Sequence, residues 1–86
     1  MGLFSSRLAK RTRLEVATIL ENFVEGRGGP RDWDDFIFLT IEDPELDAIR
    51  GRCDGLDFEF PREQAGHFCG PGGIEVIRGF ISRLRA

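Results

Sequence analysis

Three apolar stripes with the period of an α-helix, each preceded by a helix-start signal, limit the folds open to this chain. The first follows a capping box, in which the Thr12 hydroxyl can accept the N–H of Glu15 and the Glu15 carboxylate can accept that of Thr12. A helix is therefore predicted from residue 12 to about residue 25, where Gly26 supplies a stop. Its core-facing side chains are Val16, Ile19, Leu20 and Phe23.

The second stripe follows Asp43 and Pro44, a favourable N-cap residue and a residue suited to the first helical position. This helix is predicted to end near Gly55, and its stripe consists of Leu46, Ile49, Cys53 and Leu56. Residues 57–61 then alternate between polar and apolar side chains, but too briefly to indicate a strand.

The third stripe belongs to a helix that is predicted to run to the C-terminus. Gly70 and Pro71 are suited to be its cap and first residue, and Gly73 is an alternative cap. The stripe consists of Ile74, Ile77, Ile81 and Leu84, widened by Phe80.

A shorter element is predicted between the first two stripes. Asp32 can cap the N–H groups of a helix of one or two turns, and the acids that follow it suit the positive end of the helix dipole. How far this helix runs is left open, because residues 36–41 are continuously apolar except for Thr40. An extended stretch is predicted after the one or two helical turns, and a strand stays open.

Together these signals predict an all-α fold, a small irregular bundle of three main helices plus one short helix. With 86 residues, the chain (1–86) is predicted to be a single domain, because it is too short for two independent cores. Residues 1–11 are predicted either as a flexible basic arm or as a first amphipathic turn in which Leu3, Phe4 and Leu8 touch the core.

The charges are unevenly distributed along the sequence. Between Asp32 and Glu63 there are eleven acidic residues and three arginines, whereas the basic residues Arg7, Lys10, Arg11 and Arg13 lie in a start without acids. With a net charge of −3, the acidic middle disfavours nucleic acid as a partner. If the acidic middle forms a surface of the folded chain, that surface favours a basic protein partner, because opposite charges raise the rate at which two proteins meet.

We therefore predict a non-enzymatic protein-binding module that presents an acidic helical surface to a basic protein, as an inhibitor or immunity-type protein does. For Trp33, a core position that caps the bundle is favoured over a role as the anchor of this surface. The residues predicted to bind the partner are Trp33, Asp34, Asp35, Glu45, Asp47, Asp57 and Glu59.

A metal- or thiol-dependent site that uses Cys53, His67 and Cys69 is the alternative prediction. These soft ligands lack the spacing of structural zinc sites, and no catalytic set accompanies them, so neither a metal nor a cofactor is predicted. Both cysteines are predicted to be reduced thiols in a cytoplasmic protein.

A membrane-associated adaptor is a third hypothesis, because residues 1–6 fit the myristoylation pattern and basic residues follow them. No apolar stretch of the chain is long enough to span a membrane, and we predict no membrane partner.

Three segments of the chain carry a resemblance to known sequences. They are W-D-D-F at residues 33–36, the segment from Asp43 to Cys53, which begins with D-P-E-L-D-A-I-R, and C-G-P-G-G-I at residues 69–74. In these segments the chain resembles a family of small bacterial proteins of unknown function, over about its last two thirds. The resemblance implies a bacterial, cytosolic, stand-alone domain, and it assigns no role to any residue.

Overall fold

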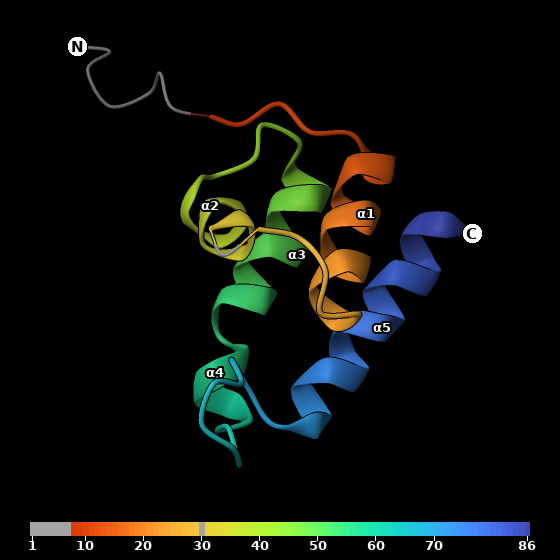
Figure 1. Cartoon of the computed structure of the whole chain (residues 1–86). Coiled ribbons are helices and arrows are strands. Elements are labelled where there is room, and N and C mark those ends of the chain that lie inside the picture. The colour runs from red at the N-terminus through yellow and green to blue at the C-terminus, as the bar shows by residue number, and fades with distance from the viewer. Residues whose placement is uncertain (1–7, 30) are drawn as a thin grey trace, which may run out of the picture.

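The computed structural model describes residues 8–29 and 31–86, which contain four helices, one of them bent (Figure 1). In chain order they are α1 (Arg13–Val24), α2 (Asp32–Phe38), the bent helix with its arms α3 (Pro44–Asp54) and α4 (Leu56–Glu59), and α5 (Pro71–Arg85). No strand forms within those residues. The predicted all-α class is confirmed, whereas the bend between α3 and α4 was not predicted.

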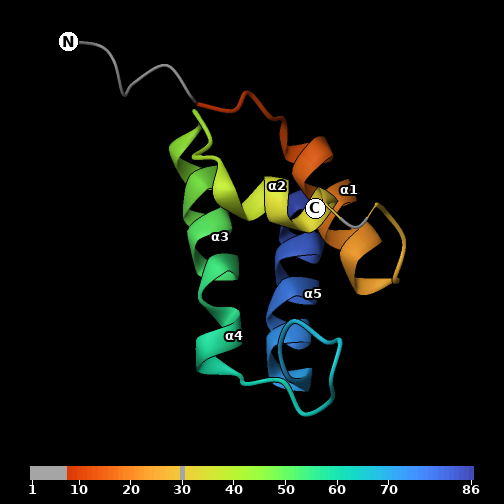
Figure 2. The ribbon, with the colours of Figure 1, turned by 60° about the vertical axis from the view of Figure 1, so that its left-hand side comes forward.

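The first and last helices form the largest interface in the fold. α1 and α5 lie side by side and antiparallel, while α3 and α4 stand on the other side of the molecule (Figures 1 and 2). α2 lies across the gap and contacts both α1 and α3. α4 contacts α5, the last helix of the chain. The helices therefore enclose one core.

The core is built from the predicted stripes together with Trp33 and Phe36 of α2. Phe36 and Leu20 are among the largest side chains that are fully buried. The thirteen buried residues of this cluster are Val16, Ala17, Leu20, Trp33, Phe36, Ile41, Leu46, Ile49, Cys53, Leu56, Cys69, Ile77 and Leu84.

Local signals set the starts of three helices as predicted. At α1 the N–H of Glu15 donates to Thr12 Oγ1 over 3.1 Å, and the N–H of Thr12 donates to Glu15 Oε1 over 2.7 Å. At α3 the Asp43 carboxylate accepts the N–H groups of the second and third helical residues. At α5 Gly70 is the N-cap and Pro71 the first residue, so the alternative start at Gly73 is wrong.

The start of α2 differs from the prediction. Arg31 occupies the N-cap position and makes no side-chain capping bond, whereas Asp32 is the first helical residue. The Asp32 carboxylate accepts the N–H of Gly29 over 2.7 Å, so it stabilises the loop before the helix. The two helical turns and the extended residue that follows them, Leu39, are as predicted.

The chain also resumes a helix where none was predicted. After Gly55 one further turn forms as α4, and the N–H of Phe60 donates to the carbonyl of Leu56 over 2.8 Å. Leu56 is fully buried, and an ion pair between Arg52 and Glu59 spans the bend. The helical turn α4 thus forms because Leu56 is buried against other elements of the fold. The alternation of polar and apolar side chains in residues 57–61 does not predict this turn.

The predicted basic arm is only partly described. Ala9 is fixed by two backbone bonds, from its N–H to the carbonyl of Thr40 (2.7 Å) and from the N–H of Glu42 to its own carbonyl (2.8 Å). Leu8 is 48% exposed and lies outside the core cluster, so the prediction that it touches the core is wrong. The myristoylation pattern and the predicted core contacts of Leu3 and Phe4 lie outside the described residues.

Candidate protein-interaction surface

Trp33 belongs to the core. Its side chain is 8% exposed and stacks on Phe23, with ring centroids 3.8 Å apart and ring planes at 15°. Phe36 and Phe68 complete the aromatic cluster, each with its centroid 5.5 Å from that of Trp33. The favoured core position is confirmed. Trp33 does not present its ring to a partner, because α2 turns this face inward between α1 and α3.

The opposite face of α2 carries an exposed aromatic residue beside two acids. Phe38 is 83% exposed, and it follows Asp34 and Asp35 by four and three residues, so the three side chains lie on neighbouring positions of one helix face. Asp34 and Asp35 form no ion pair with any residue in the described ranges. We call this group, Asp34, Asp35 and Phe38, the α2 patch.

Glu45 and Asp47, two further predicted contact residues, lie on different sides of α3. Two residues along a helix correspond to a rotation of about 160° the shorter way round. Glu45 pairs with Arg13 of α1 over 2.9 Å, whereas Asp47 faces the connection between α2 and α3. The two carboxylates therefore do not contribute to a single acidic face, and each already has a partner within the chain.

Asp47 and Arg50 join α3 to the end of α2. Asp47 Oδ1 accepts Arg50 Nε over 2.6 Å and the N–H of Ile41 over 2.9 Å, and Arg50 also donates to the carbonyl of Ile37 over 2.7 Å. The Arg50 guanidinium, followed by the Ile41 N–H, holds the pKa of Asp47 below its ordinary value of 3.8. This network fixes the segment from which Phe38 projects.

We expect Asp47→Asn to lower the free energy of unfolding by about 1–2 kcal/mol at pH 7, because it removes a charge-assisted bond from a partly exposed site. Since folding lowers this pKa, the contribution is complete above the unfolded-state pKa and is lost as pH falls through the folded-state value. Urea titrations at several pH values should show the difference shrinking below about pH 4. Asp54→Asn, at an exposed residue without an ion pair among the described residues, is the control; an equal loss there would contradict the expectation.

A second exposed aromatic residue lies on α4. Phe58 is 89% exposed, and its neighbours in the chain, Asp57 and Glu59, are both predicted contact residues. Glu59 is paired with Arg52 across the bend, whereas Asp57 has no ion pair in the described part of the chain. Apart from Glu45 and Asp47, the predicted acidic residues thus form two groups beside two exposed phenylalanines, and those of the α2 patch are the less neutralised.

Sequence reasoning did not single out Phe38 and Phe58, because large aromatic side chains usually lie in the core of a small domain. For Phe38 a helical period through residue 38 would have supplied the signal. Phe36 is about 60° from Trp33 around the helix, whereas Phe38 is about 140° away and must face outward if Trp33 faces inward. The continuous apolar run after Phe36 concealed this period.

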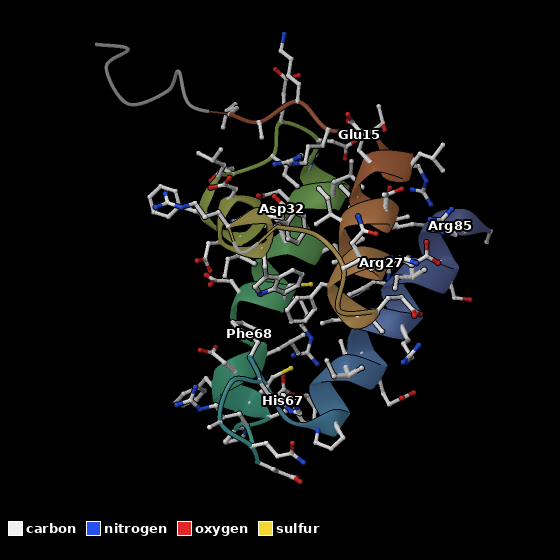
Figure 3. The ribbon with its side chains drawn as sticks, viewed as in Figure 1. Glu15, Arg27, Asp32, His67, Phe68 and Arg85 are labelled. Atoms are coloured by element: carbon white, nitrogen blue, oxygen red, sulfur yellow. The ribbon has the colours of Figure 1, made fainter. Side chains whose placement is uncertain are left out.

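The three soft ligands are not assembled into a site. Cys53 and Cys69 are buried free thiols, while His67 is exposed on the loop between α4 and α5 (Figure 3). Burial, followed by the charge of Cys69, raises the pKa of the Cys53 thiol to about 12. Burial, followed by the charge of Asp57, also raises the pKa of Cys69. Both thiols are thus disfavoured as nucleophiles or ligands at neutral pH.

Among the described residues, no group of three histidine, cysteine, aspartate or glutamate side chains is placed to hold a metal ion. The structure therefore lends no support to the alternative site at Cys53, His67 and Cys69. None of the described helices combines the length and the apolar character that crossing a membrane requires.

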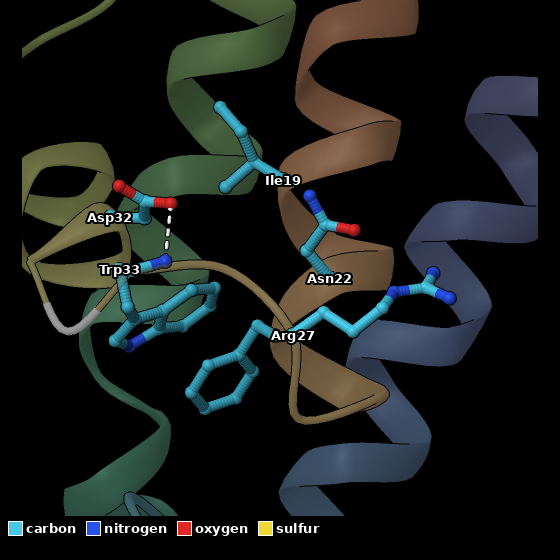
Figure 4. Close-up of a pocket in the computed structure, with 7 residues that line it drawn as sticks. Ile19, Asn22, Arg27, Asp32 and Trp33 are labelled. Atoms are coloured by element: carbon cyan, nitrogen blue, oxygen red, sulfur yellow. Dashed lines mark hydrogen bonds between the residues drawn. The ribbon is translucent and has the colours of Figure 1, made fainter.

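A small hollow lies where the loop after α1 meets the start of α2 (Figure 4). It measures about 50 Å³, well below the roughly 300 Å³ at which small-molecule sites begin. Asp32 and Gly29 close its rim through their hydrogen bond, and Trp33 forms part of its wall. The hollow has room for solvent but not for a small-molecule substrate.

No protein-family model matches the chain, and neither a curated protein nor a solved structure shows significant similarity to it. The resemblance to small bacterial proteins accordingly stays a prediction.

Proposed function

We propose that the chain is a non-enzymatic protein-binding module whose α2 patch receives a basic protein partner, in the manner of an inhibitor. The observation that carries the proposal is the exposure of Phe38 beside two carboxylates that no described cation neutralises. An exposed aromatic residue can supply the apolar contact of an interface, and the acids around it supply attraction for a partner of opposite charge.

The distribution of charge over the fold supports a basic partner. From residue 32 to residue 59, which spans α2, α3 and α4, there are ten acids and two arginines, and both arginines are already paired with acids. α1 and α5 together carry three acids and four arginines. The acidic excess thus lies on the side of the molecule that includes Phe38.

Phe38 takes the place of Trp33 as the proposed anchor. Burying a phenylalanine side chain at an interface stabilises the complex by roughly 1.5–3 kcal/mol relative to leaving it exposed. Phe38 is the last residue of α2, where Arg50 and Asp47 hold the neighbouring backbone. An anchor on a fixed segment loses little conformational freedom when it binds.

The test is a capture experiment from lysate of the source organism, with the purified chain as bait at low and at high salt. We expect a basic protein to bind the wild-type chain at low salt and to be released at high salt, because salt screens exposed charges. Once the partner is purified, Phe38→Ala and Asp34→Lys should each weaken its affinity about tenfold or more. Titration calorimetry measures both changes.

Asp54→Lys is the matched control, because it changes the net charge as much as Asp34→Lys but lies at the far end of α3. We expect it to weaken binding less than threefold, by long-range charge alone. Equal losses for the two reversals would reduce the proposal to general electrostatic attraction. An unchanged affinity for Phe38→Ala would remove the anchor.

A further inference from the structure

A long furrow runs along the antiparallel pair α1 and α5, away from the α2 patch. It consists of three depressions that share residues. One of about 270 Å³ lies between the two helices, and it shares Val24 with a second of about 370 Å³, which reaches the loop between α4 and α5. The second shares Ile74, His67 and Cys69 with a third of about 250 Å³ near the start of α5.

The floor of the furrow is apolar. Ile74 and Ile81 are seven residues apart on α5, and both are half-buried beside the line of Ile77 and Leu84, which are buried in the core. α5 thus presents a second apolar line next to the one that the core uses. Val24 of α1 and the aromatic side chains of Phe23 and Phe68 continue this floor, and all three are also half-buried.

Carboxylates lie along the rims of the furrow. Two of its four acids are paired, Glu21 with Arg85 over 3.0 Å and Glu75 with Arg78 over 3.7 Å. The other two, Glu25 and Glu63, have no ion pair with the described residues. Glu25 lines the depression between the helices and Glu63 the one near the start of α5, so an unpaired acid lies on either side of the middle depression.

The geometry points to one occupant: we infer that the furrow binds a helical segment of a partner protein with an apolar face and a cation near each end. Along α1 and α5 the walls are helices, whose backbone groups are already bonded, so this stretch offers no edge to an extended strand. The loop between α4 and α5 forms the rest of the wall. A helix satisfies its own backbone and needs only apolar contact and charge from the furrow. Ile74 and Ile81 are about 10 Å apart along α5, which corresponds to about two turns of a bound helix.

This inference goes beyond the proposed function, because the furrow and the α2 patch are separate surfaces. The probe is a synthetic peptide of about 15 residues, long enough to form a helix, with leucines on one face and arginines near both ends. A matched peptide carries glutamates in place of the arginines. Binding to the ¹⁵N-labelled chain is followed by amide chemical shifts.

We expect the arginine peptide to shift amides in residues 21–25 and 74–82 and the glutamate peptide to bind at least about tenfold more weakly. Glu25→Lys should weaken the arginine peptide about tenfold, whereas Asp34→Lys should leave its affinity within about twofold. The inference is overturned if shifts are confined to α2, if both peptides bind alike, or if no shifts appear at millimolar peptide. Shifts confined to α2 and abolished by Asp34→Lys would overturn the furrow while supporting the proposed function.

Discussion

Phe36→Ala is expected to lower the free energy of unfolding by about 3–5 kcal/mol, because it empties a fully buried aromatic position. Phe36 contacts Trp33 at a centroid distance of 5.5 Å and lies where α2 meets the rest of the core. A domain of this size is stable by roughly 5–10 kcal/mol in total, so the variant should lose a large share of its stability. Urea denaturation followed through Trp33 fluorescence measures the change.

Phe38→Ala is the matched control, since it makes the same substitution two residues later on the same helix. Phe38 is 83% exposed, and its loss should change the free energy of unfolding by no more than about 0.5 kcal/mol. A similar destabilisation by both substitutions would show that Phe38 packs against the body, and the α2 patch would then lose its anchor. The variant that binds poorly should thus be as stable as the wild type.

Gly73→Ala is the second substitution with a large expected effect on stability. Helix propensity alone predicts that it stabilises the protein, but we expect it to lower the free energy of unfolding. A Cβ atom at this position would lie 2.6 Å from Cys69 Sγ and 3.2 Å from Cys69 Cβ. Cys69 is buried, and rotating its Sγ away would still leave its Cβ at 3.2 Å from the new atom, so the crowding is only partly relieved. Overpacking costs about 1–3 kcal/mol and exceeds the roughly 1 kcal/mol gained from replacing a helical glycine. We expect net destabilisation of about 1 kcal/mol in thermal and urea unfolding.

Gly79→Ala provides the comparison, because it lies on the same helix with no atom within 4 Å of the added Cβ. There the gain in helix propensity is unopposed, and the protein should become more stable by about 0.5–1 kcal/mol. The loss of unfolding free energy caused by Gly73→Ala should also be smaller in a Cys69→Ala background, where the sulfur that crowds the new methyl group is absent. Stabilisation by Gly73→Ala in the wild-type background would contradict this account of the contact between α5 and Cys69.

Local chemistry explains which parts of the fold were predictable. The capping box at Thr12 and the Asp43–Pro44 start use groups within three residues of one another, so the sequence contains the whole signal. The turn after Gly55 depends instead on the burial of Leu56 against distant elements. Residues 57–61 could not reveal it, since nothing local indicates that Leu56 meets the start of α5.

The candidate surface was predictable in charge but not in shape. An acidic middle was evident from composition, and Asp34 and Asp35 are indeed exposed there without ion-pair partners among the described residues. Which aromatic residue of α2 faces outward depends on where α1 and α3 lie, and the sequence does not state that. Trp33 lies in the core, as favoured, whereas Phe38, which the sequence did not single out, lies at the surface.

Asp47 shows the same limit for a charged residue. Its position in an acidic run suggested a contact surface, but its carboxylate accepts bonds from Arg50 and Ile41 and holds two elements together. A carboxylate that is hydrogen-bonded within the fold and one that is free to bind another protein cannot be distinguished from the sequence. Only the donors around them separate the two roles.

The pairing of α1 with α5 has a consequence for synthesis on the ribosome. Val16, Ala17 and Leu20 leave the ribosome early, yet much of their burial depends on a helix that begins at Pro71. Because translation adds about 5–20 residues per second, the first helix waits several seconds for its main neighbour. During that interval its apolar face is open to chaperones, so this small domain completes its core only after α5 has emerged.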